Sequence, residues 1–204
     1  MSFISLNFVV LFACTFILYH TLPSRFRKAT LLTASCLFIG FYHLAFLITA
    51  LILTLTTFYL GKWIGQAKRE SGMKGIYFSG VCFLVVSWLA FRYADRLTNC
   101  HILFPLGISF YTFQAISYLT EIYWQEEEPE KSLPDFMIYM LFFMKFLSGP
   151  IERASDMLPQ LKSCKATDYT SMVYGMRLIV VGLIKKLILA DSIAPYIDGV
   201  FGSV

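Results

Sequence analysis

Long apolar segments alternate with short polar clusters along the chain, and their spacing predicts membrane-spanning helices. A helix needs about 20 apolar residues to cross the hydrocarbon core of a bilayer. Residues 2–22 form the first such segment, and basic residues follow it at once. Further apolar segments cover residues 44–60, 75–94, 102–124, 134–147 and 172–190. Between them lie a basic loop at 61–75, a polar turn at 92–99, an acidic loop at 125–131 and a polar segment at 152–168.

The apolar stretch 29–60 is too long for one upright span, and Gly40, Tyr42 and His43 interrupt it. We therefore expect a short helix followed by a full span over 44–60. Basic residues collect in cytoplasmic loops. If the stretch crosses twice and the N-terminus lies outside, ten basic residues fall inside and five outside; a single crossing gives eight and seven. The expected outside group is Arg92, Arg96, Arg153, Lys162 and Lys165. The rule favours the hairpin and about six to seven membrane segments, although the short helix has a length that also suits a re-entrant segment.

Composition agrees with a membrane protein and excludes two other classes. Hydrophobic residues make up 57% of the chain and charged residues 15%, with a mean hydropathy of +0.66. Soluble domains average about 25% charged residues, so a water-soluble globular domain is excluded. The net charge of +4 comes without a basic stripe interleaved with aromatic residues, so no nucleic-acid partner is expected. The predicted fold class is all-α, a polytopic transmembrane helical bundle with short or broken (re-entrant) helices, and its first partner is the lipid bilayer.

Lys145 is the clearest ionisable residue within an apolar segment, since it lies in the run 142–147. Charged side chains inside a membrane are costly and mark candidate functional sites. One interpretation places Lys145 in a polar cavity near a substrate path. The alternative is a lysine whose long side chain reaches the nearby membrane surface.

Gly149 and Pro150 end this apolar segment and present Glu152 and Arg153. Proline lacks a backbone donor and disfavours a helical conformation in the preceding residue. Non-helical backbone at membrane depth persists only where it is buried in protein or lines a cavity. The bend therefore predicts either an entry site lined by Glu152 and Arg153 or an ordinary helix end with a surface ion pair.

A second bend is expected at Pro105 and Gly107, near the start of the segment 102–124. Small and weakly polar residues follow it, as in closely packed membrane helices. Gln114 and Tyr118 are four residues apart and therefore share one helix face. Most of this segment is expected to be a packing face, and Gln114 is the best polar candidate on it.

The histidines and the pair Lys185 and Lys186 are weaker candidates for a functional site. His20, His43 and His101 lie at the edges or breaks of spans, without metal-ligand spacing, so no metal site is expected. Lys185 and Lys186 fit positive-inside anchoring, or alternatively a basic patch for an anionic donor or lipid head group.

Four blocks in the second half of the chain resemble the membrane-bound O-acyltransferase (MBOAT) family, in its bacterial alginate O-acetyltransferase-like branch. They have the order and spacing typical of that family, and the first half agrees more loosely. The blocks are FPLGISFYTFQAISYLTEIYW at 104–124, EEEPEKSLPDFMIYMLFFMKFLSGPIER at 126–153, LPQL at 158–161 and GLIKKLILADSIAPYIDGVF at 182–201. The resemblance implies that residues 1–204 are the N-terminal part of an MBOAT-type transmembrane domain.

The resemblance also implies an activity: transfer of an acyl group, acetyl in this branch, to a hydroxyl of a polysaccharide or cell-envelope polymer. It implies an acyl thioester or acyl carrier as donor, no bound cofactor, a cell-envelope or periplasmic acyl-transfer partner, and the bacterial inner membrane. By the same analogy, Gln114, Tyr118, Lys145, Glu152 and Arg153 are candidates for a substrate tunnel.

The family's presumed catalytic histidine lies in a later His-Gly segment that residues 1–204 do not contain, and none of the three histidines matches it. A general base must reach the proton that it removes. We therefore expect a fragment, a truncated product or one piece of a split enzyme, inactive without its C-terminal portion and with no catalytic residue of its own. A transporter-like subunit and a non-catalytic membrane scaffold are the alternatives, although the repeat typical of many transporters is not evident.

Overall fold

The computed structural model describes residues 6–67, 69–98, 105, 107–146, 149–163 and 168–201, without the side chains of 94–98, 198, 200 and 201. Two compact units divide the chain at residues 164 and 165. The first unit contains α1 (Leu6–Thr21), α2 (Ser24–Tyr42), α3 (Leu44–Gln66), α4 (Glu70–Thr98), α5 (Ile108–Tyr123), α6 (Leu133–Leu141) and α7 (Ala154–Ser163). The second unit contains α8 (Tyr169–Ile184), a π-helix (Lys185–Ala190) and α9 (Asp191–Phe201). The described residues form helices without strands, which confirms the all-α class.

Among the residues that the structure describes, two helices are long and apolar enough to cross a membrane, and both belong to the first unit. They cover Leu44–Gln66 and Glu70–Tyr93, and the apolar helix α1 is shorter. The break between α2 and α3 falls at His43, as the sequence predicts, with an extended backbone and its Nδ1 accepting the N–H of Ala45 at 3.3 Å.

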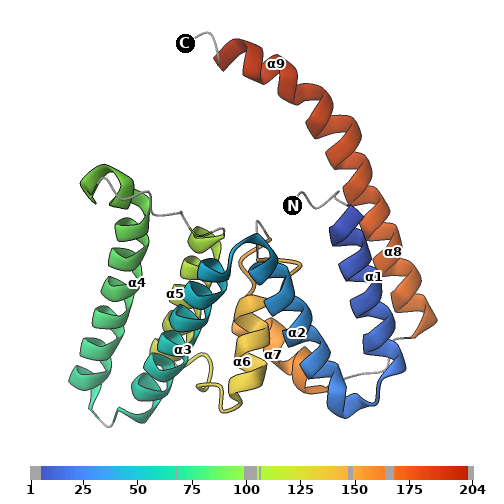
Figure 1. Ribbon diagram of the computed structural model, residues 1–204. Coiled ribbons are helices and arrows are strands. Elements are labelled where there is room, and N and C mark those ends of the chain that lie inside the picture. The colour runs from blue at the N-terminus through green and yellow to red at the C-terminus, as the bar shows by residue number, and fades with distance from the viewer. Residues whose placement is uncertain are drawn as a thin grey trace. The chain divides into compact units, whose positions relative to one another are not determined.

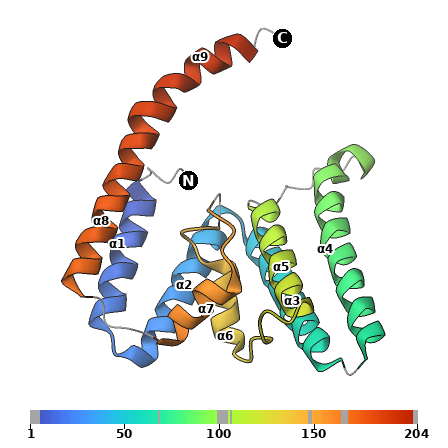
Figure 2. The ribbon, with the colours of Figure 1, turned by 180° about the vertical axis from the view of Figure 1, so that it is seen from behind.

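Consecutive helices of the first unit run in opposite directions (Figures 1 and 2). The α1–α2 junction, the adjoining ends of α3 and α4, and the α5–α6 loop therefore lie at one end, the lower end in Figure 1. We call this the basic end, because Arg25, Arg27, Lys28, Lys62 and Lys74 belong to it.

Several helix boundaries differ from the sequence expectation. Helix α2 begins at Ser24, earlier than the short helix expected from residue 29, so its basic residues lie in its first turns. Their contacts explain this, since Arg25 and Arg27 lie over the rings of Phe26 and Tyr19 and Lys28 is ion-paired. The basic loop expected at 61–75 is also mostly helical, because α3 ends at Gln66 and α4 begins at Glu70. At the polar turn, residues 92–98 continue α4, and Asn99 lies outside the described residues.

The apolar segment 134–147 is not one helix. Helix α6 ends at Leu141, and residues 143–146 form a turn. The following polar segment contains α7, which the sequence analysis did not predict. Helix α6 has nine residues and α7 has ten, so at 1.5 Å per residue each is about 15 Å long.

Helices α3, α4 and α5 lie side by side and form what we call the long-helix region (Figure 1). Close approach is possible because α3 has glycine where α5 packs against it: a Cβ on Gly61 would lie 2.7 Å from Cε1 of Tyr118. Between α4 and α5, Trp88 Nε1 donates to Ser109 Oγ at 2.9 Å. Ser109, one of the small residues of α5, thus contacts α4, in agreement with the expected packing face.

The second unit is one continuous run of helix. The expected span 172–190 corresponds to α8 and the π-helix, and α9 extends it to residue 201. Asp168 caps α8 by accepting the N–H of Ser171 at 2.9 Å, and hydrogen bonding from the side chain and backbone of Ser171 lowers the pKa of this exposed carboxyl. Lys185 and Lys186 lie in the π-helix, where Lys186 forms an ion pair with Asp191.

Candidate functional site

Lys145 is buried in the first unit, against α6 and α7. Its side chain is 6% exposed, and its Nζ donates to Glu152 Oε2 at 3.1 Å. The same Nζ lies 3.1 Å from the sulfur of Met157 and 4.6 Å from the centre of the Tyr139 ring. The Lys145 side chain is therefore enclosed within the first unit, and its place near a substrate path stays a prediction.

The backbone around Lys145 is fixed by tight turns. Its N–H donates to the carbonyl of Phe142 at 3.1 Å, and its carbonyl accepts the N–H of Gly149 at 2.9 Å. Gly149 packs directly over the Lys145 backbone, where a Cβ would collide with Lys145 Cα. The bend expected here thus positions the buried lysine; Pro150 follows in an exposed, irregular segment.

The bend at Pro105 and Gly107 contacts the turn at residues 143–146, which contains Lys145. Gly107 caps α5 with φ of 74°, a left-handed conformation that glycine adopts at little cost. A Cβ at Gly107 would collide with the carbonyl oxygen of Phe146, next to Lys145. The carbonyl of Pro105 accepts the N–H of Ile108 at 3.2 Å and so begins the helix. The two predicted bends are therefore in contact, although 42 residues separate Gly107 from Gly149 in the sequence.

Glu152 and Arg153 lie between the turn at residues 143–146 and α7, and their side chains have different surroundings. Glu152 is 44% exposed, pairs with Lys145, and its carbonyl accepts the hydroxyl of Tyr139 at 3.0 Å. Arg153 is exposed, and its carbonyl accepts the N–H groups of Asp156 and Met157 in the first turn of α7. Only Glu152 therefore contributes a side chain to the lysine pocket among these contacts.

Gln114 and Tyr118 share the face of α5 that packs against α6, as expected from their spacing. Gln114 Nε2 donates to the carbonyl of Tyr139 at 2.8 Å. The hydroxyl of Tyr118 accepts the N–H of Glu130 at 3.0 Å, and both side chains are buried. Gln114 thus touches the residue whose ring lies beneath Lys145, whereas Tyr118 leads to the opposite end of α6.

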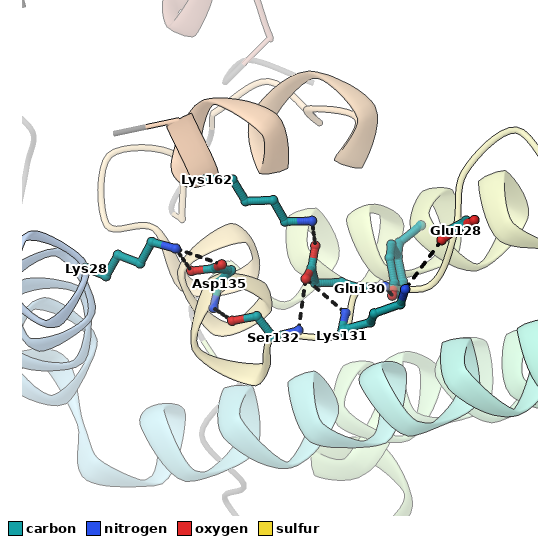
Figure 3. A network of polar contacts seen from close by, with 8 residues as sticks. Lys28, Glu128, Glu130, Lys131, Ser132, Asp135 and Lys162 are labelled. Atoms are coloured by element: carbon teal, nitrogen blue, oxygen red, sulfur yellow. Dashed lines mark hydrogen bonds and ion pairs between the residues drawn. The ribbon is translucent and has the colours of Figure 1, made fainter. Parts of the chain in front are cut away.

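At that end, a second group of charges surrounds the start of α6 (Figure 3). Glu130 is buried; its Oε1 accepts the N–H groups of Lys131 and Ser132, each at 2.9 Å. Its Oε2 lies 2.6 Å from Nζ of Lys162 at the end of α7, and this contact raises the pKa of Lys162. This ion pair therefore joins the start of α6 to the end of α7, and we call these two short helices the α6–α7 hairpin.

Asp135 forms the neighbouring pair. Its carboxylate is buried and lies 2.7 Å from Nζ of Lys28 in the first turns of α2. Ser132 caps α6 by accepting the N–H of Asp135 at 3.4 Å. Lys28, Asp135, Glu130 and Lys162 thus join α2, α6 and α7 at the basic end (Figure 3).

This group corrects one sequence expectation and adds residues that were missed. Lys162 was expected on the side opposite Lys28, but α7 runs back along α6, so both lysines lie at the basic end. Glu130 and Asp135 were not among the predicted site residues. The sequence could have indicated Glu130 and Asp135 as paired residues, because carboxylates beside an apolar helix need partners. It could not have identified the partners, Lys162 and Lys28, because they lie far away in the sequence.

The lysine pocket can hold or stabilise negative charge. A lysine ammonium has three N–H donors, and Glu152, Met157 and the Tyr139 ring occupy the space around this one. Glu152 is the only half-exposed group among these neighbours. An incoming anion or polarised carbonyl would therefore reach Lys145 by displacing Glu152.

Comparison with curated proteins finds relatives along nearly the whole chain. This chain is 31% identical to a probable alginate O-acetylase of Azotobacter vinelandii, and the match covers 98% of this chain and 44% of the relative. A probable alginate O-acetylase of Pseudomonas aeruginosa is 30% identical, over 98% of this chain and 42% of its own length. A peptidoglycan O-acetyltransferase of Helicobacter pylori is 26% identical, over 85% of this chain and 40% of its own length.

No family model and no solved structure matches the chain. The chain spans less than half the length of the curated relatives that it matches. The resemblance predicted from the four sequence blocks is nevertheless confirmed, because the match extends over both compact units. Over 98% of its length, the chain is therefore similar to part of the bacterial alginate O-acetylases.

Proposed function

We propose that this chain forms the N-terminal portion of a membrane-bound O-acyltransferase that acetylates hydroxyls of a polysaccharide or cell-envelope polymer. The observation that carries the proposal is the match to alginate O-acetylases over 98% of the chain. The peptidoglycan O-acetyltransferase among the relatives supports the same reaction on another polymer. An acyl thioester or acyl carrier is the proposed donor, and a periplasmic acyl-transfer protein is the proposed partner.

In this proposal, Lys145 supplies positive charge to the wall of the reaction path. Preorganised charge near a developing oxyanion is one of the largest contributions to catalysis in water-excluded sites. Glu152 forms an ion pair with Lys145 in the absence of substrate. The bound substrate replaces the Glu152 carboxylate next to the Lys145 ammonium. Gln114 and Tyr118 hold α6 in register with α5, and so place the Tyr139 ring beneath Lys145.

We further propose a multi-pass protein of the bacterial inner membrane in which α6 and α7 form a re-entrant hairpin. Each helix is about 15 Å long, half of the ~30 Å hydrocarbon core. The start of α6 and the end of α7 are joined by the Glu130–Lys162 pair at the basic end. Both ends of the hairpin would then face the cytoplasm, where basic residues collect.

A chimeric protein tests the function. Residues 1–204 would replace the matching segment of the Azotobacter vinelandii relative, in an alginate-producing strain that lacks its own O-acetylase. We expect acetylated alginate from the chimera and none from residues 1–204 alone, since a general base is required. A stably inserted chimera that leaves alginate unacetylated would favour the scaffold or transporter-like alternatives.

The same chimera tests the lysine pocket. Lys145→Met should lower acetylation on the order of 10²-fold, as expected for loss of one stabilising group at an oxyanion. Glu128→Ala, which removes a charge from the exposed loop, is the matched control and should leave acetylation unchanged. An active Lys145→Met chimera would exclude the proposed role of this lysine.

Single cysteines tested with a membrane-impermeant reagent check the re-entrant hairpin. In a protein whose native cysteines are replaced, Lys162→Cys and Arg69→Cys should react from the same side of the membrane. Reaction of the two from opposite sides would mean that α6 and α7 together cross the bilayer.

A further inference from the structure

An apolar groove runs between α1 and α2 of the first unit, and Lys145, Glu152 and Met157 are not among its lining residues. It has a volume of about 450 Å³ and is partly open to the surroundings. Its walls are Leu11, Cys14, Thr15, Leu18, Leu22, Phe26, Ala29, Thr30, Thr33, Ala34 and Leu37. This groove, which we call the α1–α2 groove, has no role in the proposed acyl transfer.

The lining of the groove suits a hydrocarbon chain. Most of its side chains are aliphatic, and two of its hydroxyls are already bonded to their own helices. Thr15 Oγ1 donates to the carbonyl of Leu11 at 2.7 Å, and Thr30 Oγ1 donates to that of Phe26 at 3.0 Å. The groove therefore offers little for a polar ligand to bind.

The length of the groove matches one leaflet of a bilayer. Along α2 it extends from Phe26 to Leu37, and along α1 from Leu11 to Leu22. At 1.5 Å per residue, either wall is about 16 Å long. This is close to half of the ~30 Å hydrocarbon core, which is the depth that one acyl chain of a phospholipid occupies.

One end of the groove carries a positive charge. The Phe26 ring forms the wall there, and Cζ of Arg25 lies 4.6 Å from the centre of that ring. Nearby Lys28 is engaged by Asp135. Arg25 is exposed and has no ion-pair partner among the residues that the structure describes. An unpaired guanidinium at the mouth of an acyl-length groove is complementary to an anionic phospholipid head group.

We infer that the α1–α2 groove binds one acyl chain of an anionic phospholipid, with the phosphate of its head group on Arg25. The inference rests on the proposed membrane location, but it is independent of the acyltransferase activity. Bound there, the lipid would tie the junction of α1 and α2 to the leaflet at the basic end.

Native mass spectrometry of the purified chain tests the site. The protein would be released from detergent after equilibration with dioleoyl phosphatidylglycerol or with dioleoyl phosphatidylcholine, which carry the same acyl chains. We expect one phosphatidylglycerol to be retained in preference to phosphatidylcholine. Arg25→Gln should weaken phosphatidylglycerol binding about fivefold, the ratio that corresponds to ~1 kcal/mol per basic residue near a membrane surface.

Two controls separate this site from general attraction to the basic end. Arg69→Gln removes an equal charge at the start of α4, away from the groove, and should leave retention unchanged. Ala29→Phe fills the groove and keeps Arg25, so it should lower retention of both lipids, while circular dichroism checks that the helices remain folded.

Three outcomes would overturn the inference. Equal retention of the two lipids by the unmodified protein would contradict the proposed contact between Arg25 and an anionic head group. An equal loss in Arg25→Gln and Arg69→Gln would indicate diffuse electrostatics. Unchanged binding in folded Ala29→Phe would show that lipid lies elsewhere or that another segment of the protein covers the groove.

Discussion

The long-helix region of α3, α4 and α5 and the hairpin of α6 and α7 are adjacent, yet different forces hold them. In the long-helix region, close contact depends on glycine and on apolar packing, and threonines such as Thr54 and Thr57 bond to their own helices. In the hairpin, buried charges at both ends fasten the short helices to their neighbours. Helices long enough to satisfy their own backbone can rely on packing, whereas short helices leave many end groups that need polar partners.

The largest expected effect falls on the hairpin, at Glu130. Glu130→Ala leaves the N–H groups of Lys131 and Ser132 without their acceptor and removes the partner of Lys162. We expect a loss of about 3 kcal/mol in the free energy of unfolding. Thermal unfolding in detergent, followed by circular dichroism, measures this loss.

Glu128→Ala provides the matched control for Glu130. Its carboxylate lies 3.8 Å from Lys131, and both side chains are almost fully exposed. Exposed pairs contribute roughly 0–1 kcal/mol, so this change should be near neutral. Equal effects of the two substitutions would mean that the hairpin does not depend on its buried charge.

The second effect tests close packing in the long-helix region. Gly61→Ala places a Cβ 2.7 Å from the Tyr118 ring and should destabilise the protein by about 2 kcal/mol, as overpacking typically does. Gly72→Ala adds the same methyl group to α4 in open space and should stabilise it by up to ~1 kcal/mol through helix propensity. If both changes stabilise the protein in thermal unfolding, α3 and α5 are not in close contact.

A smaller, asymmetric effect is expected at the lysine pocket. Glu152→Gln leaves the buried Lys145 ammonium without its counter-ion and should cost about 1–2 kcal/mol. Lys145→Met removes the buried charge beside Met157 and leaves a half-exposed carboxylate, so its effect on unfolding should be close to zero. A greater loss of stability in Lys145→Met than in Glu152→Gln would contradict this account of the pocket.

The smallest effect is a pH dependence. Hydrogen bonding to Glu130 raises the pKa of Lys162 above its usual 10.5. The contribution of the pair to stability is therefore fully present below pH 10.5 and is lost as the pH rises through the higher folded-state value. Lys162 is more than half exposed, so the loss amounts to a few tenths of a kcal/mol.

The difference in melting temperature between the unmodified protein and Lys162→Met isolates this contribution. It should be constant from pH 8 to about 10 and should shrink above pH 10.5. A difference that grows with pH would have the wrong sign for a lysine stabilised by a carboxylate.

The sequence predicted the helices of the long-helix region well, because length and apolar composition are local properties. The breaks at His43 and Gly107 were also visible, since glycine and interrupting polar residues mark them directly. Boundaries were wrong where charged residues continue a helix, as at Lys62 and Lys74.

The contacts of the hairpin were not predictable in the same way. The Lys28–Asp135 pair joins residues 107 positions apart, and a single sequence does not indicate which lysine meets which carboxylate. Helix α7 was missed because the segment 152–168 is polar and lacks a long apolar run. The spacing of Ala154, Met157, Leu158 and Leu161 does follow a helical face, and could have revealed it.

The shortness of α6 has a consequence for biosynthesis. A segment of nine residues is too short to enter the bilayer as an independent span during translation. Asp135 in α6 pairs with Lys28 of α2, which is synthesised earlier, whereas Glu130 just before α6 meets Lys162 only after α7 has been synthesised. If α6 and α7 insert as the proposed re-entrant hairpin, they join helices that precede them in the sequence, and the lysine pocket can form only once α7 has been synthesised.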